Sequence, residues 1–230
     1  MPRTSLALMM SAALWHGAVF AAPDEAGWQL HHIEEGSAGN AAIQVFMHQR
    51  GDQVPAFRVE TRLQARLSSL VAVLMDSEHM PEWVHRTRRV NRLVSERPTE
   101  GVSQVIVGMP WPLLDREAIV AWQLSQDVQT GVVTLAGRSA PEMLPPDPGR
   151  VRMPSFESTW RLAPLGGGEV AVRFEGLGDP GGSLASPLLR VFVDAAVWQS
   201  PLYTVSALRA QVALPRYADA AWPFIREPAP

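Results

Sequence analysis

Histidine and acidic side chains are common metal ligands, and the six histidines of this chain are scattered along it. His31 and His32 are adjacent, so in a strand their side chains point to opposite faces and cannot bind one ion together. The remaining histidines, among them His48, His79 and His85, show no HExxH spacing. We therefore expect no metal site and no cofactor.

Sequence motifs for nucleophilic catalysis and nucleotide binding are also missing. The chain has no GxSxG elbow, no P-loop and no dinucleotide fingerprint. The glycine-rich run LGGGE at 165–169 joins two predicted strands and opens no helix, so a hairpin turn explains it better. The residues predict a protein without catalytic residues, that is, no enzyme.

Arg116 is the one charged side chain that the pattern places on an inward face. In REAIVAWQLSQD it shares a strand face with Val120 and Trp122, because side chains alternate between the two faces. A buried guanidinium needs a partner. We favour an internal ion pair with a carboxylate of the protein, and the alternative is the polar head of a ligand.

Alternation of apolar and polar residues dominates the chain and predicts antiparallel strands with one buried face. The clearest are the segments 57–63, 156–162 and 169–175. Further strands are predicted near 28–34, 42–50, 87–95, 103–108, 116–127 and 131–138. The opposite faces of these three segments carry charged residues and are expected to be exposed to solvent.

Two segments have helical spacing instead. Ser68 is predicted to cap a short helix, SLVAVLMDS. A long C-terminal helix is predicted over 186–214, and Pro201 inside it should kink it or split it in two. Its apolar stripe consists of Leu188, Phe192, Ala195, Trp198, Leu202, Val205, Leu208 and Val212. The tail after Tyr217 is expected to be peripheral.

Composition narrows the class of protein. The sequence predicts a signal peptide at 1–21, because a positive residue is followed by an apolar run and then by Val19-Phe20-Ala21. One domain is predicted over 22–230, with its core at 28–214. We therefore expect a periplasmic or secreted protein, and a monomer. The net charge of −3 and the lack of a basic cluster exclude nucleic-acid binding. With no cysteine the domain has no disulfides.

Seven tryptophans lie beyond the predicted signal peptide, and several fall on inward faces. They can pack a filled core, or they can form the aromatic wall of a cavity between a curved sheet and a helix. Periodicity does not separate these alternatives. The tract GMPWPLLDREA at 108–118 is equally notable, because its prolines exclude it from the middle of a sheet and place much apolar surface in a turn.

Four tracts in sequence resemble the START (steroidogenic acute regulatory protein-related lipid transfer) domain family over residues 28–214. They are LMDSEHMPEWV, MPWPLLDREAIVAWQLSQD, VRMPSFESTWRLAPLGGGEVAV and DPGGSLASPLLRVFVDAAVWQSPLYTVSALRAQV. Glu117 stands where the family often has aspartate. The resemblance implies an α+β helix-grip fold, in which a curved antiparallel sheet wraps a long C-terminal helix and encloses a hydrophobic tunnel.

The resemblance also implies binding of one lipid or sterol-like molecule without covalent chemistry, transient contact with a membrane surface, and a lid loop over the tunnel mouth. The expected ligand-binding residues are Trp111, Leu113, Leu114, Arg116, Trp122, Phe156, Trp160, Phe174, Phe192 and Trp198. Two alternatives remain open at this point. One is a cyclase or aromatase-type enzyme on the same fold, and the other is a protein-interaction module with a filled core.

Overall fold

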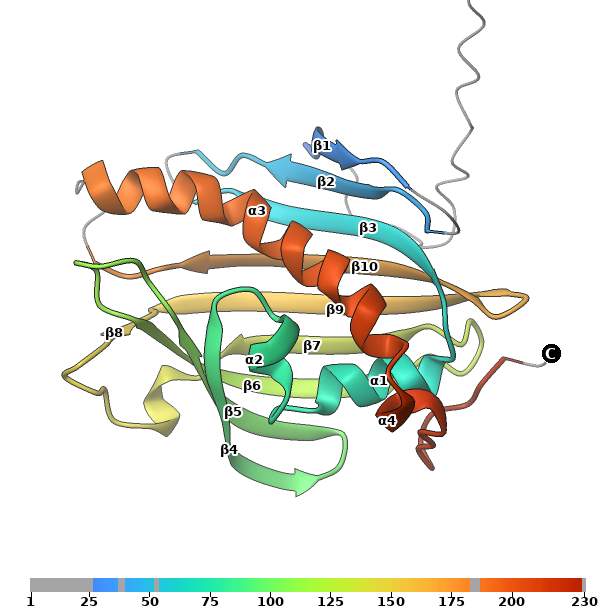
Figure 1. Cartoon of the computed structure of the whole chain (residues 1–230). Helices are drawn as coiled ribbons and strands as arrows, with labels where there is room; N and C mark the ends of the chain where they lie inside the picture. Colours follow the sequence, from blue (N-terminus) through green and yellow to red (C-terminus); the bar gives the residue numbers. More distant parts are fainter. Residues whose placement is uncertain (1–26, 37–39, 52–53, 183–186, 229–230) are drawn as a thin grey trace, which may run out of the picture.

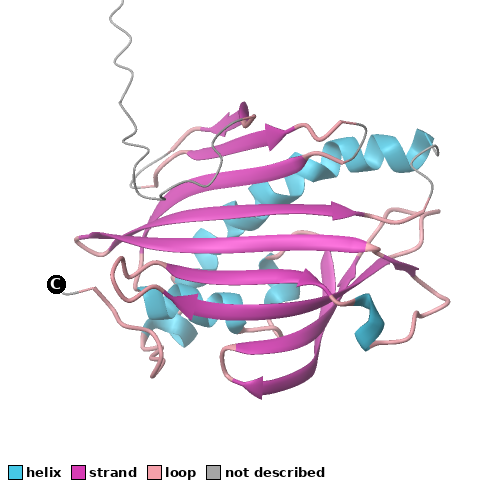
Figure 2. Cartoon of the chain, turned by 180° about the vertical axis from the view of Figure 1, so that it is seen from behind, coloured by secondary structure: helices cyan, strands magenta, loops and turns pink. Residues whose placement is uncertain are grey.

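The structure is a computed structural model that describes residues 27–36, 40–51, 54–182 and 187–228. The predicted signal peptide lies outside the described residues. Ten strands form one curved sheet, and its concave face holds a long C-terminal helix (Figure 1). Figure 2 shows the opposite, convex face, where the short 3-10 helix η1 (Pro141–Met143) lies and which the α-helices leave uncovered. The predicted α+β architecture, a curved antiparallel sheet with a long terminal helix, is confirmed.

Nine of the ten strands lie close to predicted positions, and the short β8 was not predicted. They are β1 Gln29–Glu34, β2 Ile43–His48, β3 Ala56–Gln64, β4 Thr87–Arg97, β5 Glu100–Val107, β6 Arg116–Gln126, β7 Val133–Ser139, β8 Val151–Arg152, β9 Ser155–Gly166 and β10 Glu169–Asp179. Their order across the sheet is β1-β2-β3-β10-β9-β7-β6-β5-β4. Neighbours along this path are antiparallel, and the short β8 pairs with β6 in parallel.

The charged face of β3 and β10 is less exposed to solvent than the alternation of residues predicts. Arg58 and Glu60 are both buried, because each forms an ion pair with the residue directly opposite it on β10. Arg58 pairs with Glu175, and Glu60 pairs with Arg173 at 2.7 Å. Charges of opposite sign facing each other across a ladder stabilise the pairing of the strands. On the convex face these two charged side chains of β3 are therefore buried against their partners on the opposite strand.

Helix α1 (Leu67–Met75) begins one residue before the predicted cap. Its N-cap is Arg66, which makes no side-chain capping bond, and Ser68 lies within the helix. The backbone N–H groups of Leu67 and Ser68 instead donate to the carboxylate of Glu227, at 3.0 and 2.8 Å. The predicted cap at Ser68 is therefore wrong, and Glu227, near the C-terminal end of the chain, accepts the hydrogen bonds at the start of α1 instead.

The C-terminal tail packs into the fold, so the expectation of a peripheral tail is wrong. After α4 (Pro215–Ala218) the chain buries Ile225, and Trp222 donates to the carbonyl of Ser68 at 3.2 Å. Tyr217 is buried and donates its hydroxyl to Asp76 at 2.9 Å. Burial, with the charge of Asp76, raises the pKa of Tyr217 to about 12. The tail closes the end of the sheet where α1 lies.

Replacing Glu227 with alanine is expected to destabilise the domain by about 1 kcal/mol, since two N–H groups at the start of α1 lose their acceptor. Chemical denaturation measures this change. Glu78→Ala is the matched control, because Glu78 is an exposed acid beyond the other end of α1. A difference between the two variants below about 0.3 kcal/mol would contradict the capping role.

Helix α3 (Pro187–Val212) is one helix and is not split by Pro201. Figure 1 shows its axis bending partway along. Proline has no N–H to donate to the carbonyl of Val197, one turn back, which is the usual cause of such a bend. Beyond Pro201 the helix buries Leu202, Val205 and Leu208 against the sheet and α1. Before Pro201 it lies over a cavity instead.

The inward stripe in the first half of α3 agrees with the predicted one at Phe192 and departs from it after that residue. Ala195, which the predicted stripe includes, is exposed. Phe192, Ala196 and Ser200, spaced four apart, all line the cavity. The side chain of Leu188 lies outside the described part. Among the described residues, no helix is both long enough and apolar enough to cross a bilayer.

Candidate functional site

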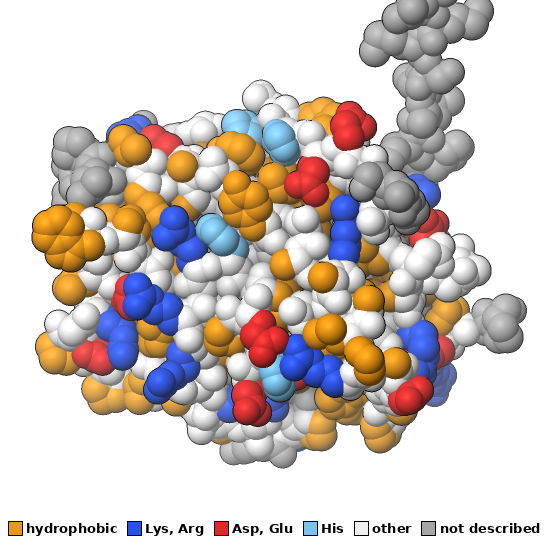
Figure 3. Space-filling view, viewed as in Figure 1, with side chains coloured by type: hydrophobic (Ala, Val, Ile, Leu, Met, Phe, Trp, Pro, Cys, Tyr) orange, Lys and Arg blue, Asp and Glu red, His pale blue; other side chains and the backbone are white. Residues whose placement is uncertain are grey.

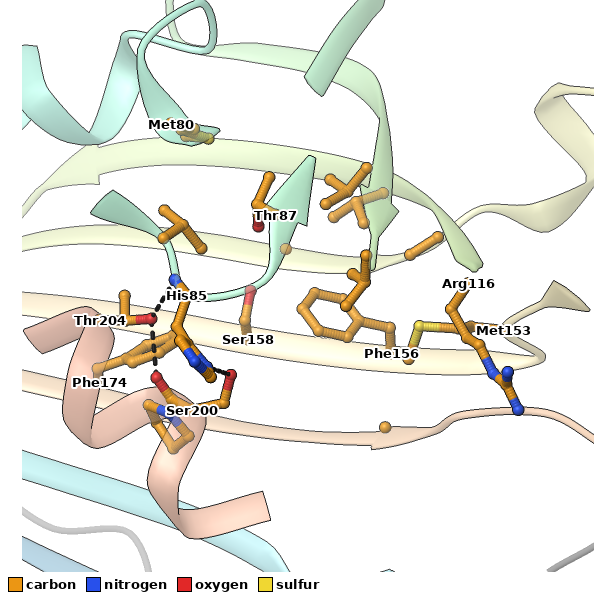
Figure 4. Close-up of a pocket in the computed structure, with 18 of the residues that line it drawn as sticks. Met80, His85, Thr87, Arg116, Met153, Phe156, Ser158, Phe174, Ser200 and Thr204 are labelled. Carbon is orange, nitrogen blue, oxygen red and sulfur yellow. Dashed lines mark hydrogen bonds between the residues drawn. The ribbon is translucent and has the colours of Figure 1, made fainter. Parts of the chain in front are cut away.

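A cavity of about 380 Å³ lies between the concave face of the sheet and the first half of α3. Figure 4 shows part of its wall, to which β6, β9, β10, α3 and the segment before β4 all contribute. An engineered apolar cavity of roughly 150 Å³ already admits benzene. This cavity is more than twice that size, so it can hold one larger apolar molecule. Its lining includes Val105, Val107, Val120, Met153, Leu177 and Val193.

Six of the ten predicted ligand-binding residues line this cavity. They are Arg116, Trp122, Phe156, Trp160, Phe174 and Phe192. Trp160 and Phe174, on neighbouring strands β9 and β10, stack in parallel with their ring centroids 4.0 Å apart. Cross-strand register places these two rings directly opposite each other. The alternation of the strands thus delivers the aromatic side chains to one wall of the cavity.

The other four predicted residues lie outside the cavity wall. Trp111 is 92 % exposed and Leu114 is 52 % exposed, on the β5–β6 loop beside the N-terminal end of α3. Leu113 in the same loop is half-buried. Trp198 faces β1, where its ring centroid lies 5.1 Å from that of His31 and 5.3 Å from that of His32, so the expectation that these two histidines point to opposite faces is wrong. The register of β1 shifts between Leu30 and His32, which breaks the alternation there. Figure 3 shows hydrophobic side chains at the surface at the end of the molecule where α3 begins.

The prediction of an internal ion pair at Arg116 is wrong. Arg116 is 4 % exposed, and its Nε donates to the carbonyl of Pro180 at 3.0 Å while Nη1 donates to that of Leu114 at 2.6 Å. In the described part of the chain no carboxylate pairs with it. Burial lowers the pKa of Arg116, and the charge of Asp115 partly opposes this. The guanidinium nevertheless stays charged at neutral pH, as arginine does in proteins.

The buried ion pair belongs to the next residue, on the other face of β6. Glu117 is fully buried, and its carboxylate accepts from Arg152 at 2.9 Å, from Gln104 at 2.8 Å and from the backbone N–H of Asp147 at 3.0 Å. Arg152 also donates to three backbone carbonyls of the loop that precedes β8. Glu117 and Arg152 together hold this loop on the convex face.

Sequence reasoning missed a polar group at the opposite end of the cavity from Arg116. Figure 4 shows His85, Ser200 and Thr204 together there. The His85 ring nitrogen Nδ1 lies 2.8 Å from the Ser200 hydroxyl, and the His85 backbone N–H donates to Thr204 Oγ1 at 3.1 Å. Thr204 in turn donates to the carbonyl of Ser200 at 2.9 Å. His85 follows the short helix α2 (Met80–Trp83), and nothing in the sequence links that helix to α3, so the sequence carried no signal for this group.

The segment with His85 connects α3 to the edge of the sheet at β4 through hydrogen bonds. The neighbouring Arg86 places its guanidinium over the Phe192 ring, 4.8 Å from the centroid. Burial, together with the charge of Arg86, lowers the pKa of His85 below its ordinary value, so the ring is neutral at neutral pH. A neutral imidazole and two hydroxyls offer hydrogen bonds without charge at this end of the cavity.

The comparisons with known proteins agree with this architecture. No protein-family model matches the chain. An uncharacterised protein of Pseudomonas aeruginosa is 26 % identical over 183 residues, which is 79 % of this chain and 85 % of that protein.

Two solved structures have closely similar folds. A STAR-related lipid transfer protein from Xanthomonas axonopodis superposes with a TM-score of 0.70 at 27 % identity, over 82 % of this chain and 99 % of that one. Human StAR-related lipid transfer protein 5 gives a TM-score of 0.68 at 16 % identity, over 82 % and 88 % of the two chains. The fold of this chain is therefore that of the START domains, the helix-grip fold.

Proposed function

We propose that this chain, which has the START helix-grip fold, binds one lipid or sterol-like molecule in its internal cavity without covalent chemistry. The observation that carries the proposal is the 380 Å³ cavity with its mainly apolar wall. Each methylene group moved from water into such a site contributes about 0.8 kcal/mol. The lipid transfer proteins with the same fold support the same conclusion.

The cavity also weighs against the alternative of an interaction module with a filled core. Protein interiors are close-packed, with few voids larger than a water molecule, so a void of this size is seldom left without a purpose. Its position also supports ligand binding, because the solidly packed core lies at the other end of the sheet, around α1 and the C-terminal tail.

An enzyme on the same fold is the other alternative, and the contact between His85 and Ser200 is the observation that raises it. A serine nucleophile needs a base, a group that orients the base, and nearby N–H donors for the oxyanion. The residue after Ser200 is Pro201, which has no N–H, and no carboxylate in the described residues holds the His85 ring. We therefore propose that these groups bind and do not react.

Native mass spectrometry of the protein, purified after expression of the full sequence, tests ligand binding directly. We expect one lipid or sterol-like molecule to co-purify at near one-to-one stoichiometry and to be identified after extraction. A protein that carries nothing, and that also takes up nothing from vesicles, would overturn the proposed function. The mass of the polypeptide in the same spectrum tests the proposed export, because removal of residues 1–21 leaves a chain that starts at Ala22.

We propose further that the β5–β6 loop contacts a membrane during loading or release. Trp111, Leu114 and Val191 are strongly exposed apolar side chains on this loop and on the adjacent first turns of α3. Tryptophan favours the membrane–water interface, because its ring is apolar at one end and polar at the other. A loop of this kind next to the cavity can enter the head-group region while the cavity faces the bilayer.

Replacing Trp111 with aspartate is expected to slow extraction of lipid from vesicles at least about tenfold, because a charged side chain does not enter the interface readily. The melting temperature should not change, since the side chain is almost fully exposed. Val128→Asp is the matched control, because Val128 is 80 % exposed on the distant β6–β7 turn. Equal extraction rates for both variants and the unmodified chain would refute membrane contact through this loop.

A further inference from the structure

Arg116 is a buried charge with unused hydrogen-bonding capacity at one end of the cavity. A guanidinium has five N–H donors. Nε donates to Pro180 and one Nη1 proton donates to Leu114, which leaves three N–H groups without a protein partner in the part of the chain that the structure describes. A buried charge without a counter-ion is costly, and the two carbonyls compensate it in part.

The acidic side chains that stand nearest to Arg116 in the chain are engaged elsewhere. Asp115 pairs with Arg88 at 3.3 Å and accepts from the backbone N–H of Met109 at 3.0 Å. Glu117 lies on the opposite face of β6 and pairs with Arg152. Neither of these two acids forms an ion pair with Arg116.

Asp179, close to the carbonyl of Pro180 that Arg116 contacts, accepts from the N–H of Gly181 at 2.8 Å. Gly181 and Gly182, which have φ angles of 70° and 78°, place no side chain beside the guanidinium. A Cβ on Gly182 would lie 3.8 Å from Nη2 of Arg116. Gly182 thus adds no side chain of its own to the space beside Nη2.

We propose that Arg116 binds the anionic head group of the ligand, so that the cavity takes an amphiphilic acid with a carboxylate or a phosphate. This inference rests on the proposed function and adds the chemical class of the ligand. The planar fork of arginine matches both anions in geometry. In Figure 4, Met153 and Phe156 lie beside Arg116 and the wall continues apolar from there, which suits a ligand whose hydrocarbon body begins next to its charge.

Three probes with the same chain test the proposal on the lipid-stripped protein: hexadecanoate, hexadecyl phosphate and hexadecan-1-ol. Isothermal titration calorimetry below the micellar concentrations measures each dissociation constant. We expect at least one acid to bind at least about tenfold more tightly than the alcohol, as charge-assisted hydrogen bonds require. The acid with the lower dissociation constant then shows whether the site prefers a carboxylate or a phosphate.

Arg116→Gln is expected to remove the preference for the acids and to leave the affinity for hexadecan-1-ol within about threefold. Arg116→Lys keeps the charge without the fork, so it should keep part of the preference, and it serves if the glutamine variant does not fold. A purely structural brace between Leu114 and Pro180 would instead weaken the binding of acids and alcohol alike.

Two results would overturn the assignment of the anion while leaving lipid binding intact. One is equal affinity of the unmodified chain for the alcohol and both acids, and the other is an undiminished preference for the acids in Arg116→Gln. Failure of all three probes to bind overturns it as well. The native mass spectrum then decides whether the proposed function falls with it.

Discussion

Replacing Glu117 with alanine is expected to destabilise the fold by roughly 3 to 5 kcal/mol, the usual cost of breaking a buried ion pair from one side. The carboxylate is fully buried, and its loss leaves Arg152 without its counter-ion. Gln104 and the N–H of Asp147 lose their acceptor at the same time. Chemical denaturation followed by tryptophan fluorescence measures the change.

Two further variants make this result specific. Glu157→Ala removes an exposed acid from strand β9 of the same sheet and should stay within about 0.5 kcal/mol of the unmodified chain. The double variant Glu117→Ala, Arg152→Ala should be less destabilised than the sum of the two single changes, because no buried charge is left unpaired. A cost below about 1 kcal/mol for Glu117→Ala would mean that the network contributes little.

The same network makes stability depend on pH. Burial alone would raise the pKa of Glu117, but the hydrogen bonds from Asp147, Gln104 and Arg152 outweigh it and lower the pKa below its ordinary value. Because the pKa is lower in the folded than in the unfolded chain, the contribution is complete above the unfolded value of about 4.3. It is lost as the pH falls through the pKa of the folded state. Glu117→Gln should therefore flatten the acid limb of the stability profile.

Filling the cavity is expected to have the largest effect on binding. Ala196→Trp places an indole ring on the cavity side of α3, where it takes up a large share of the 380 Å³. We expect the amount of co-purifying ligand to fall at least about tenfold, since overlap of ligand and side chain cannot be relieved in a packed site. Native mass spectrometry compares the bound fractions.

Ala195→Trp is the matched control for this change. Ala195 is the preceding residue in the same helix, but it is exposed, so the same side chain points to solvent there. Both variants should remain folded with melting temperatures close to that of the unmodified chain. If Ala196→Trp binds as much ligand as Ala195→Trp, the ligand does not occupy this cavity.

The strands and the long helix could be predicted from the sequence because their signals are local. A segment such as β10 alternates cleanly, and the registers of β9 and β10 then bring Trp160 and Phe174 together. Phe192 follows from helical spacing in the same way. Alternation also placed Arg116 on the inward face, where the structure has it.

The partners of these residues could not be predicted, because they come from distant segments. Arg116 donates to a backbone carbonyl of the β10–α3 turn, and the type of a residue does not indicate where its backbone carbonyl points. Glu227 caps α1 from about 160 residues away, and no local pattern in the tail links it to that helix. His85 and Ser200 meet because the corner before β4 contacts α3, which depends on how the sheet curves.

The pairing of β3 with β10 has a consequence for how the chain folds. Strands β1 to β3 join the rest of the sheet along this one ladder, whose two sides come from opposite ends of the chain. While the chain is being synthesised, the edge of β3 that pairs with β10 therefore stays unpaired until β10 is complete. Contacts of such sequence separation are slow to form, and an unpaired edge attracts other chains. Closure of this seam should set the rate of folding and be the step at which aggregation competes.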